Sequence, residues 1–106
     1  MKRQQVRLKD IKAGVTIYTV HALGTRSYLQ QQVITSRPYV NNYGSLFYRY
    51  GNNESSCKDM NMIPNQYNYH KAFFTENAAK RYVETCAIYD IDSTIEDDEY
   101  YDSYKY

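Results

Sequence analysis

Apolar positions recur at helical spacing near the C-terminal end of the chain, between residues 73 and 86. Charged side chains occupy the positions between them, which is the pattern of an amphipathic helix. Thr75 is a favourable N-cap, and Glu76 places negative charge in the first turn. The pattern predicts one helix over about residues 76–87, packed against preceding strands through a stripe of Ala79, Tyr82, Val83 and Cys86.

Upstream of this helix the apolar positions alternate with a period of two, which predicts strands. Three such stretches lie at residues 15–21, 28–35 and 45–50, separated by turn residues such as Gly14 and Pro38. We expect residues 51–56 to form a loop and residues 67–73 to be extended. The polar run Gln30–Gln32 is expected to be exposed or at a sheet edge, where it could support a symmetric dimer.

These elements predict an α+β fold. We expect a small antiparallel sheet of three to five strands, which can curl into an SH3-like barrel, packed against one C-terminal helix. A chain of 106 residues is one domain, and we assign residues 1–95 to it. Residues 96–106 are acidic and rich in Tyr, so we expect a disordered tail, because like charges repel and little can be buried.

The net charge of +1 conceals a strong asymmetry along the chain. Residues 1–12 carry five basic side chains and one acidic one, whereas residues 90–106 carry seven acidic side chains and one basic one. Such polarisation is typical of an interaction tail. It is equally compatible with a tail that screens the basic end of the same molecule.

The aromatic content is unusual because the chain has 14 Tyr, 3 Phe and no Trp. A tyrosine ring packs against apolar neighbours while its hydroxyl stays hydrated. The Tyr content therefore indicates either a thin core in which Tyr replaces Phe, or a recognition surface, since Tyr is enriched at protein interfaces.

No secretory signal or membrane-spanning run is recognisable, so we expect a cytoplasmic protein. Its two cysteines, Cys57 and Cys86, are then expected to remain thiols.

The sequence offers little catalytic chemistry. His21, His70, Cys57 and Cys86 are scattered without the spacing of a metal site, so we expect no metal and no cofactor. Cys57 with His70 is the one pair that could act as nucleophile and base. The four glycines are isolated and form no phosphate-binding loop. We therefore expect a protein that is not an enzyme.

Two segments resemble small accessory and host-takeover proteins of tailed bacteriophages. The stretch Leu8–Tyr18 resembles the opening of small phage β-barrel-like domains, and Phe73–Tyr82 resembles the closing helix of many phage proteins. This resemblance implies a role in binding and inhibiting a host protein, such as a CRISPR effector, a restriction enzyme or RNA polymerase.

The leading hypothesis is a non-enzymatic binding protein, a phage-encoded inhibitor of a host defence or other host protein. The alternative is a small nucleic-acid-binding β domain with an autoinhibitory acidic tail, because basic residues are interleaved with tyrosines. The expected contact surface comprises the hairpin of residues 39–50 and the loop of residues 60–70. Its candidate residues are Arg37, Tyr39, Tyr43, Tyr48, Tyr50, Met60, Met62, Tyr67, Tyr69 and His70.

Overall fold

The computed structural model of the protein describes residues 4–63 and 68–91. Two short 3-10 helices, six strands and one α-helix follow one another in these ranges. Their order is η1 (Leu8–Asp10), β1 (Thr16–His21), η2 (Gly24–Arg26), β2 (Tyr28–Val33), β3 (Tyr39–Val40), β4 (Leu46–Tyr50), β5 (Asn53–Ser56), β6 (Lys71–Phe73) and α1 (Glu76–Ile88).

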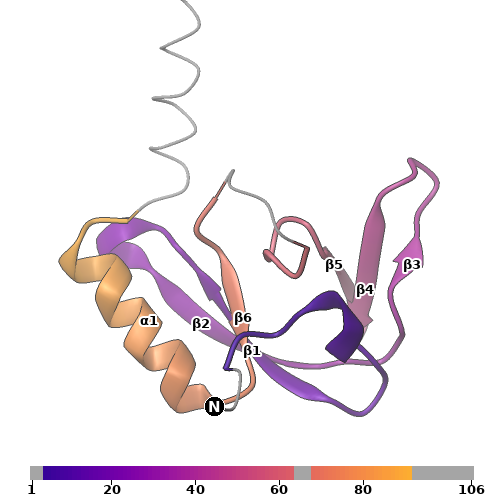
Figure 1. Cartoon of the computed structure of the whole chain (residues 1–106), viewed down its shortest axis with the longest axis horizontal. Coiled ribbons are helices and arrows are strands. Elements are labelled where there is room, and N and C mark those ends of the chain that lie inside the picture. Colours follow the sequence, from indigo (N-terminus) through magenta and orange to yellow (C-terminus); the bar gives the residue numbers. More distant parts are fainter. Residues whose placement is uncertain (1–3, 64–67, 92–106) are drawn as a thin grey trace, which may run out of the picture.

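The strands form two antiparallel sheets of three strands each, in the orders β2-β1-β6 and β3-β4-β5. Figure 1 shows α1 beside the first sheet and the second sheet standing at the opposite side of the molecule. The predicted α+β class with one C-terminal helix is confirmed. Among the described residues the strands form two open sheets and not a closed barrel, so the SH3-like alternative is wrong.

Helix α1 forms where the sequence predicts it. The Thr75 hydroxyl accepts a hydrogen bond from the Ala78 amide, at 3.2 Å, and Lys80 pairs with Glu76 one turn away, at 2.8 Å. The helix packs against β1, β2 and β6. Its predicted stripe faces the sheet, with Ala79 and Cys86 buried and Tyr82 and Val83 packed against Val20 and Phe73.

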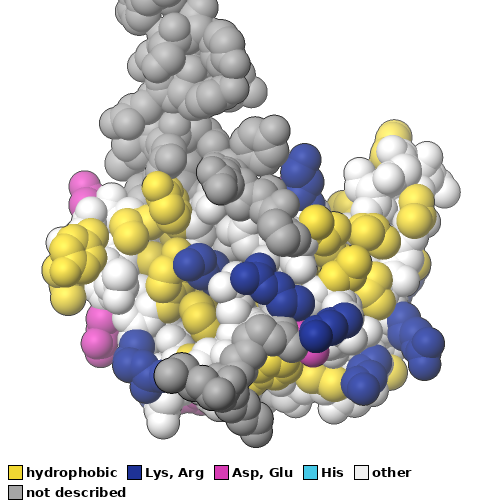
Figure 2. Space-filling model, in the orientation of Figure 1, with side chains coloured by type: hydrophobic (Ala, Val, Ile, Leu, Met, Phe, Trp, Pro, Cys, Tyr) yellow, Lys and Arg dark blue, Asp and Glu magenta, His cyan; other side chains and the backbone are white. Residues whose placement is uncertain are grey.

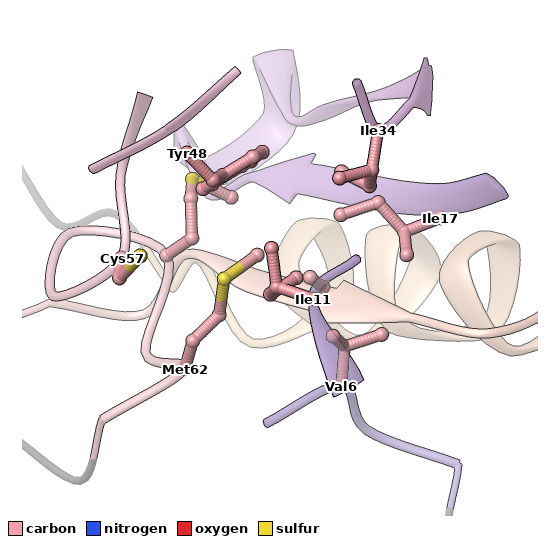
Figure 3. Close-up of a cluster of buried hydrophobic side chains, with 9 residues drawn as sticks. Val6, Ile11, Ile17, Ile34, Tyr48, Cys57 and Met62 are labelled. Atoms are coloured by element: carbon pink, nitrogen blue, oxygen red, sulfur yellow. The ribbon is translucent and has the colours of Figure 1, made fainter. Parts of the chain in front are cut away.

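A second and larger core joins the two sheets. Figure 3 shows its side chains converging from both sheets, from the N-terminal segment and from the loop after β5. The cluster consists of Val6, Ile11, Ile17, Ile34, Tyr48, Cys57, Met60, Met62 and Ala72. Burial of this apolar surface helps to hold the second sheet on the first, together with the Ile34–Tyr50 bridge and the hydrogen bond from the Thr35 amide to the Arg49 carbonyl.

A side-chain hydrogen bond within this core also joins the two sheets. The Tyr48 hydroxyl on β4 donates to Gln32 Oε1 on β2 at 2.5 Å, and both side chains are buried. The run Gln30–Gln32 was expected to be exposed or at a sheet edge, and it lies on β2, the edge strand of the first sheet. Gln30 and Gln31 are exposed, whereas the Gln32 side chain is buried and its amide oxygen is satisfied from the second sheet.

Three boundaries differ from the sequence prediction. Residues 53–56, expected in a loop, form β5, and residues 39–40 form the short strand β3. β2 ends at Val33, although a further bridge joins Ile34 to Tyr50. The expected tail at residues 96–106 lies outside the described residues. No helix among the described residues is long and apolar enough to span a bilayer.

Candidate protein-binding surface

The β3–β4 turn is held rigidly by a single asparagine. Asn41 Oδ1 accepts hydrogen bonds from the amides of Tyr43 and Ser45, each at 3.0 Å. The backbone of Asn41 also bonds to Ser45 and Gly44, at 2.9 and 3.1 Å. Gly44 adopts φ of +80°, which glycine accommodates without steric cost. The hydrogen-bonded backbone of the turn therefore places Tyr43 at the surface, with 92% of its surface exposed.

The loop after β5 folds back against β4. The Cys57 amide donates to the Leu46 carbonyl at 3.1 Å, and the Met62 amide donates to the Cys57 carbonyl at 3.0 Å. Between them, Asn61 takes a left-handed conformation with φ of 58°. This sharp reversal turns Met60 and Met62 inward, where both side chains are buried in the larger core.

Asn61 also connects this loop to two other segments. Its side-chain amide donates to the carbonyls of Asn68 and His70, at 3.1 and 2.6 Å. Its own carbonyl accepts from Arg7 Nη1 at 3.1 Å. Residues 57–63 of this loop are thus tied through Asn61 to the N-terminal segment and to the approach to β6.

A groove of about 530 Å³ lies between the β3–β4 turn and this loop. Phe47 and Ile63 offer apolar surface, whereas Lys58 and Asp59 contribute one charge of each sign. Figure 2 shows hydrophobic side chains gathered over the second sheet on this side. The complete lining is Gly44, Ser45, Leu46, Phe47, Ser56, Lys58, Asp59 and Ile63. Such a groove suits an apolar side chain of a partner flanked by polar groups.

One candidate contact residue, Tyr39, is engaged by neighbouring side chains of the second sheet. The Tyr39 hydroxyl donates to the Glu54 carboxylate, a contact that raises the pKa of Tyr39. The Arg49 guanidinium lies 5.0 Å from the centre of the Tyr39 ring. Arg37, close to Tyr39 in the chain, is exposed. This part of the sheet is therefore ordered by its own side chains.

His70 belongs to a separate aromatic cluster that the sequence did not reveal. The His21 ring stacks on Tyr28 with centroids 4.7 Å apart, and it lies 5.5 Å from the His70 ring. His70 Nδ1 accepts from the Ala22 amide at 2.9 Å, so this nitrogen has a structural role. Burial lowers the pKa of His21, although a hydrogen bond with Gln30 opposes this effect. The neutral form of the His21 imidazole is therefore favoured at neutral pH.

The cysteines do not have the environment of reactive thiols. Cys57 lies in the larger core, and burial raises the pKa of its thiol to about 11. Burial also raises the pKa of Cys86. A nucleophilic cysteine requires the opposite shift. Within the described ranges, no three His, Cys, Asp or Glu side chains are grouped so that they could hold a metal ion.

The structure changes the set of candidate contact residues. Tyr43 is exposed, and Tyr39, Tyr50, Tyr69 and His70 are partly exposed. Tyr48, Met60 and Met62 are buried, so their assignment to the contact surface is wrong, because the core needs their apolar area. Tyr67 lies outside the described residues. Val40 was not predicted, although it is also strongly exposed on the hairpin.

These features define a small α+β protein with a preformed surface at its β3–β4 hairpin. Residues 5–86 match the model of a family described as Phage g100-like protein. The match covers more than half of the chain, so the protein belongs to the phage g100-like family, and the predicted phage origin is confirmed. No curated protein matched the chain, and no solved structure did either.

Proposed function

We propose that this phage protein is a non-enzymatic binding protein that inhibits a protein of the bacterial host. The observation that carries this proposal is the exposed Tyr43 on a rigid turn beside a groove. Large exposed aromatic side chains are the residues that most often dominate binding energy at interfaces. A defence nuclease or a restriction enzyme is the class of target that fits a phage protein of this kind.

Rigidity supports the same proposal. Binding is opposed by the entropy lost when mobile loops become ordered. Asn41 holds the backbone of the turn and Asn61 that of the groove loop, so less backbone ordering is needed on association.

Affinity capture from host lysate tests the proposal, with the full chain as bait. Tyr43→Ala should recover less of the bound host protein than the unmodified chain, with affinity reduced about 30-fold, as for a hot-spot residue of about 2 kcal/mol. Tyr89→Ala is the matched control, because Tyr89 is also highly exposed but follows α1, outside the hairpin and the groove. Equal recovery by all three proteins would refute the hairpin as the contact surface.

Binding of nucleic acid is a second candidate, supported by the distribution of charge. Figure 2 shows Lys and Arg side chains spread across one face between α1 and the second sheet, while the visible acidic side chains lie mainly beside α1. Contacts to phosphates would make binding strongly dependent on salt. Deletion of residues 96–106 should then strengthen retention on immobilised DNA or RNA at low salt. Absence of retention with and without these residues would eliminate this candidate.

A further inference from the structure

β2 lies at the edge of the first sheet. The backbone N–H and C=O groups of successive residues in this strand point alternately toward β1 and away from it. The Ile34 amide donates to the Val15 carbonyl at 2.8 Å, so residue 34 faces the β1 side. The Gln30 carbonyl also faces β1, where it accepts from the Thr19 hydroxyl. Because backbone groups alternate along a strand, those of Leu29 and Gln31 point away from β1.

On the side of β2 that faces away from β1, described residues form backbone pairs only beyond the end of the strand. The Thr35 amide donates to the Arg49 carbonyl at 2.9 Å, and Ile34 bridges to Tyr50, so β4 covers this section. No described residue pairs with Leu29 or Gln31 on the same side. The section of the edge that no described residue covers therefore runs from Tyr28 to about Gln32.

This section lacks the usual protection of a strand edge. Natural edge strands carry charged residues, proline or bulges that prevent pairing with another strand. The sequence of β2, Tyr-Leu-Gln-Gln-Gln-Val, has none of these residues in a chain that is 24% charged. Tyr28 and Val33 at its two ends are 49% and 50% exposed.

We propose that β2 pairs antiparallel with β2 of a second copy of this chain, about a two-fold axis at Gln30. An axis at Gln31 would place Tyr28 of one copy against Ile34 of the other, where Tyr50 already lies. With the axis at Gln30, Leu29 of each copy exchanges both backbone hydrogen bonds with Gln31 of the other. The two first sheets then form one continuous sheet, as in other isologous dimers.

The choice of a second copy rests on the lack of charge along the edge. The competing occupant is the C-terminal segment of the same chain, because the Ile91 carbonyl accepts from the Gly24 amide at 2.8 Å, near the start of β2. Residues 92–106 are strongly acidic, and β2 has no basic side chain to attract them. Paired glutamines across the axis carry no charge and complement one another.

Substitutions that introduce charge at the two-fold axis test this arrangement, with sedimentation equilibrium as the measurement. The unmodified chain should form a dimer of twice 12.6 kDa in a concentration-dependent manner, because a strand pair is a small interface. Gln30→Lys and Gln30→Glu should each weaken the dimer at least about tenfold, since like charges face one another at the axis. An equimolar mixture of the two variants should restore it.

Asn42→Lys and Asn42→Glu are the matched controls, since they make the same charge changes at an exposed turn outside β2. Both should leave the dimer unchanged. Thermal melts establish that the variants fold, and Gln30→Glu keeps an oxygen that can accept from Gln32 Nε2. A monomeric unmodified chain, or a dimer that survives both Gln30 variants, would overturn the proposal. So would a chain that dimerises only without residues 92–106, because the tail would then occupy the edge.

Discussion

The hydrogen bond between Tyr48 and Gln32 allows a quantitative test of how the two sheets are held together. Tyr48→Phe removes the hydroxyl and leaves the ring in place. Gln32 Oε1 is then buried without the donor that lies 2.5 Å away. Leaving a buried acceptor unpaired costs about 1–3 kcal/mol. For a domain of this size, each kcal/mol lowers the melting temperature by roughly 4–8 °C.

A double-mutant cycle separates this bond from the packing of the ring. Gln32→Leu combined with Tyr48→Phe removes both partners, so no unpaired acceptor remains, and the double variant should be more stable than Tyr48→Phe alone. Urea denaturation followed by circular dichroism measures the free energies of unfolding. Burial raises the pKa of Tyr48, so its hydroxyl stays protonated and remains a donor at neutral pH. A Tyr48→Phe variant within about 0.5 kcal/mol of the unmodified chain would refute the reasoning.

Two further predictions concern groups whose protonation the fold controls. Burial lowers the pKa of His21 below 6.5, so the folded state favours the neutral ring. The free energy of unfolding should therefore decline as the pH falls below about 6.5. His21→Gln should flatten this dependence when melting is measured at a series of pH values. A variant with the same pH slope as the unmodified chain would contradict this. The pKa of Cys57 is raised to about 11, so its thiol should react slowly with a disulfide reagent at mildly alkaline pH until urea is added. Rapid reaction of native Cys86→Ala protein, whose only thiol is Cys57, would show that the site is accessible.

The helix and three of the strands could be predicted because their signals are local. The N-cap and the apolar stripe of α1 lie within one short segment, and β1, β2 and β4 alternate along their own sequence. β5 has no such signal, since Asn53–Ser56 is entirely polar. It is a strand through its pairing with β4, which runs from Phe47–Ser56 to Tyr50–Asn53.

The division into two sheets could not be predicted, because it depends on contacts distant in sequence. Gln32 is buried only because Tyr48 reaches it from another sheet. Met60 and Met62 lie in a segment without periodicity, and their burial depends on the left-handed turn at Asn61. The tyrosines of the hairpin are enough to propose a contact surface there from the sequence. The groove beside the hairpin could not be predicted, because residues distant in sequence line it.

The burial of these methionines changes what a binding experiment can show. Met60 and Met62 pack in the same core as Tyr48, while the loop that carries them forms one wall of the groove. The other wall is joined to this loop through the Cys57 amide and the Leu46 carbonyl. Substitution of either methionine would therefore alter the shape of the groove without removing a contact. Reduced binding by such a variant would report lost preorganisation, whereas reduced binding by Tyr43→Ala would report a lost contact. Only the second result, at unchanged thermal stability, identifies the hairpin as the surface that meets a partner.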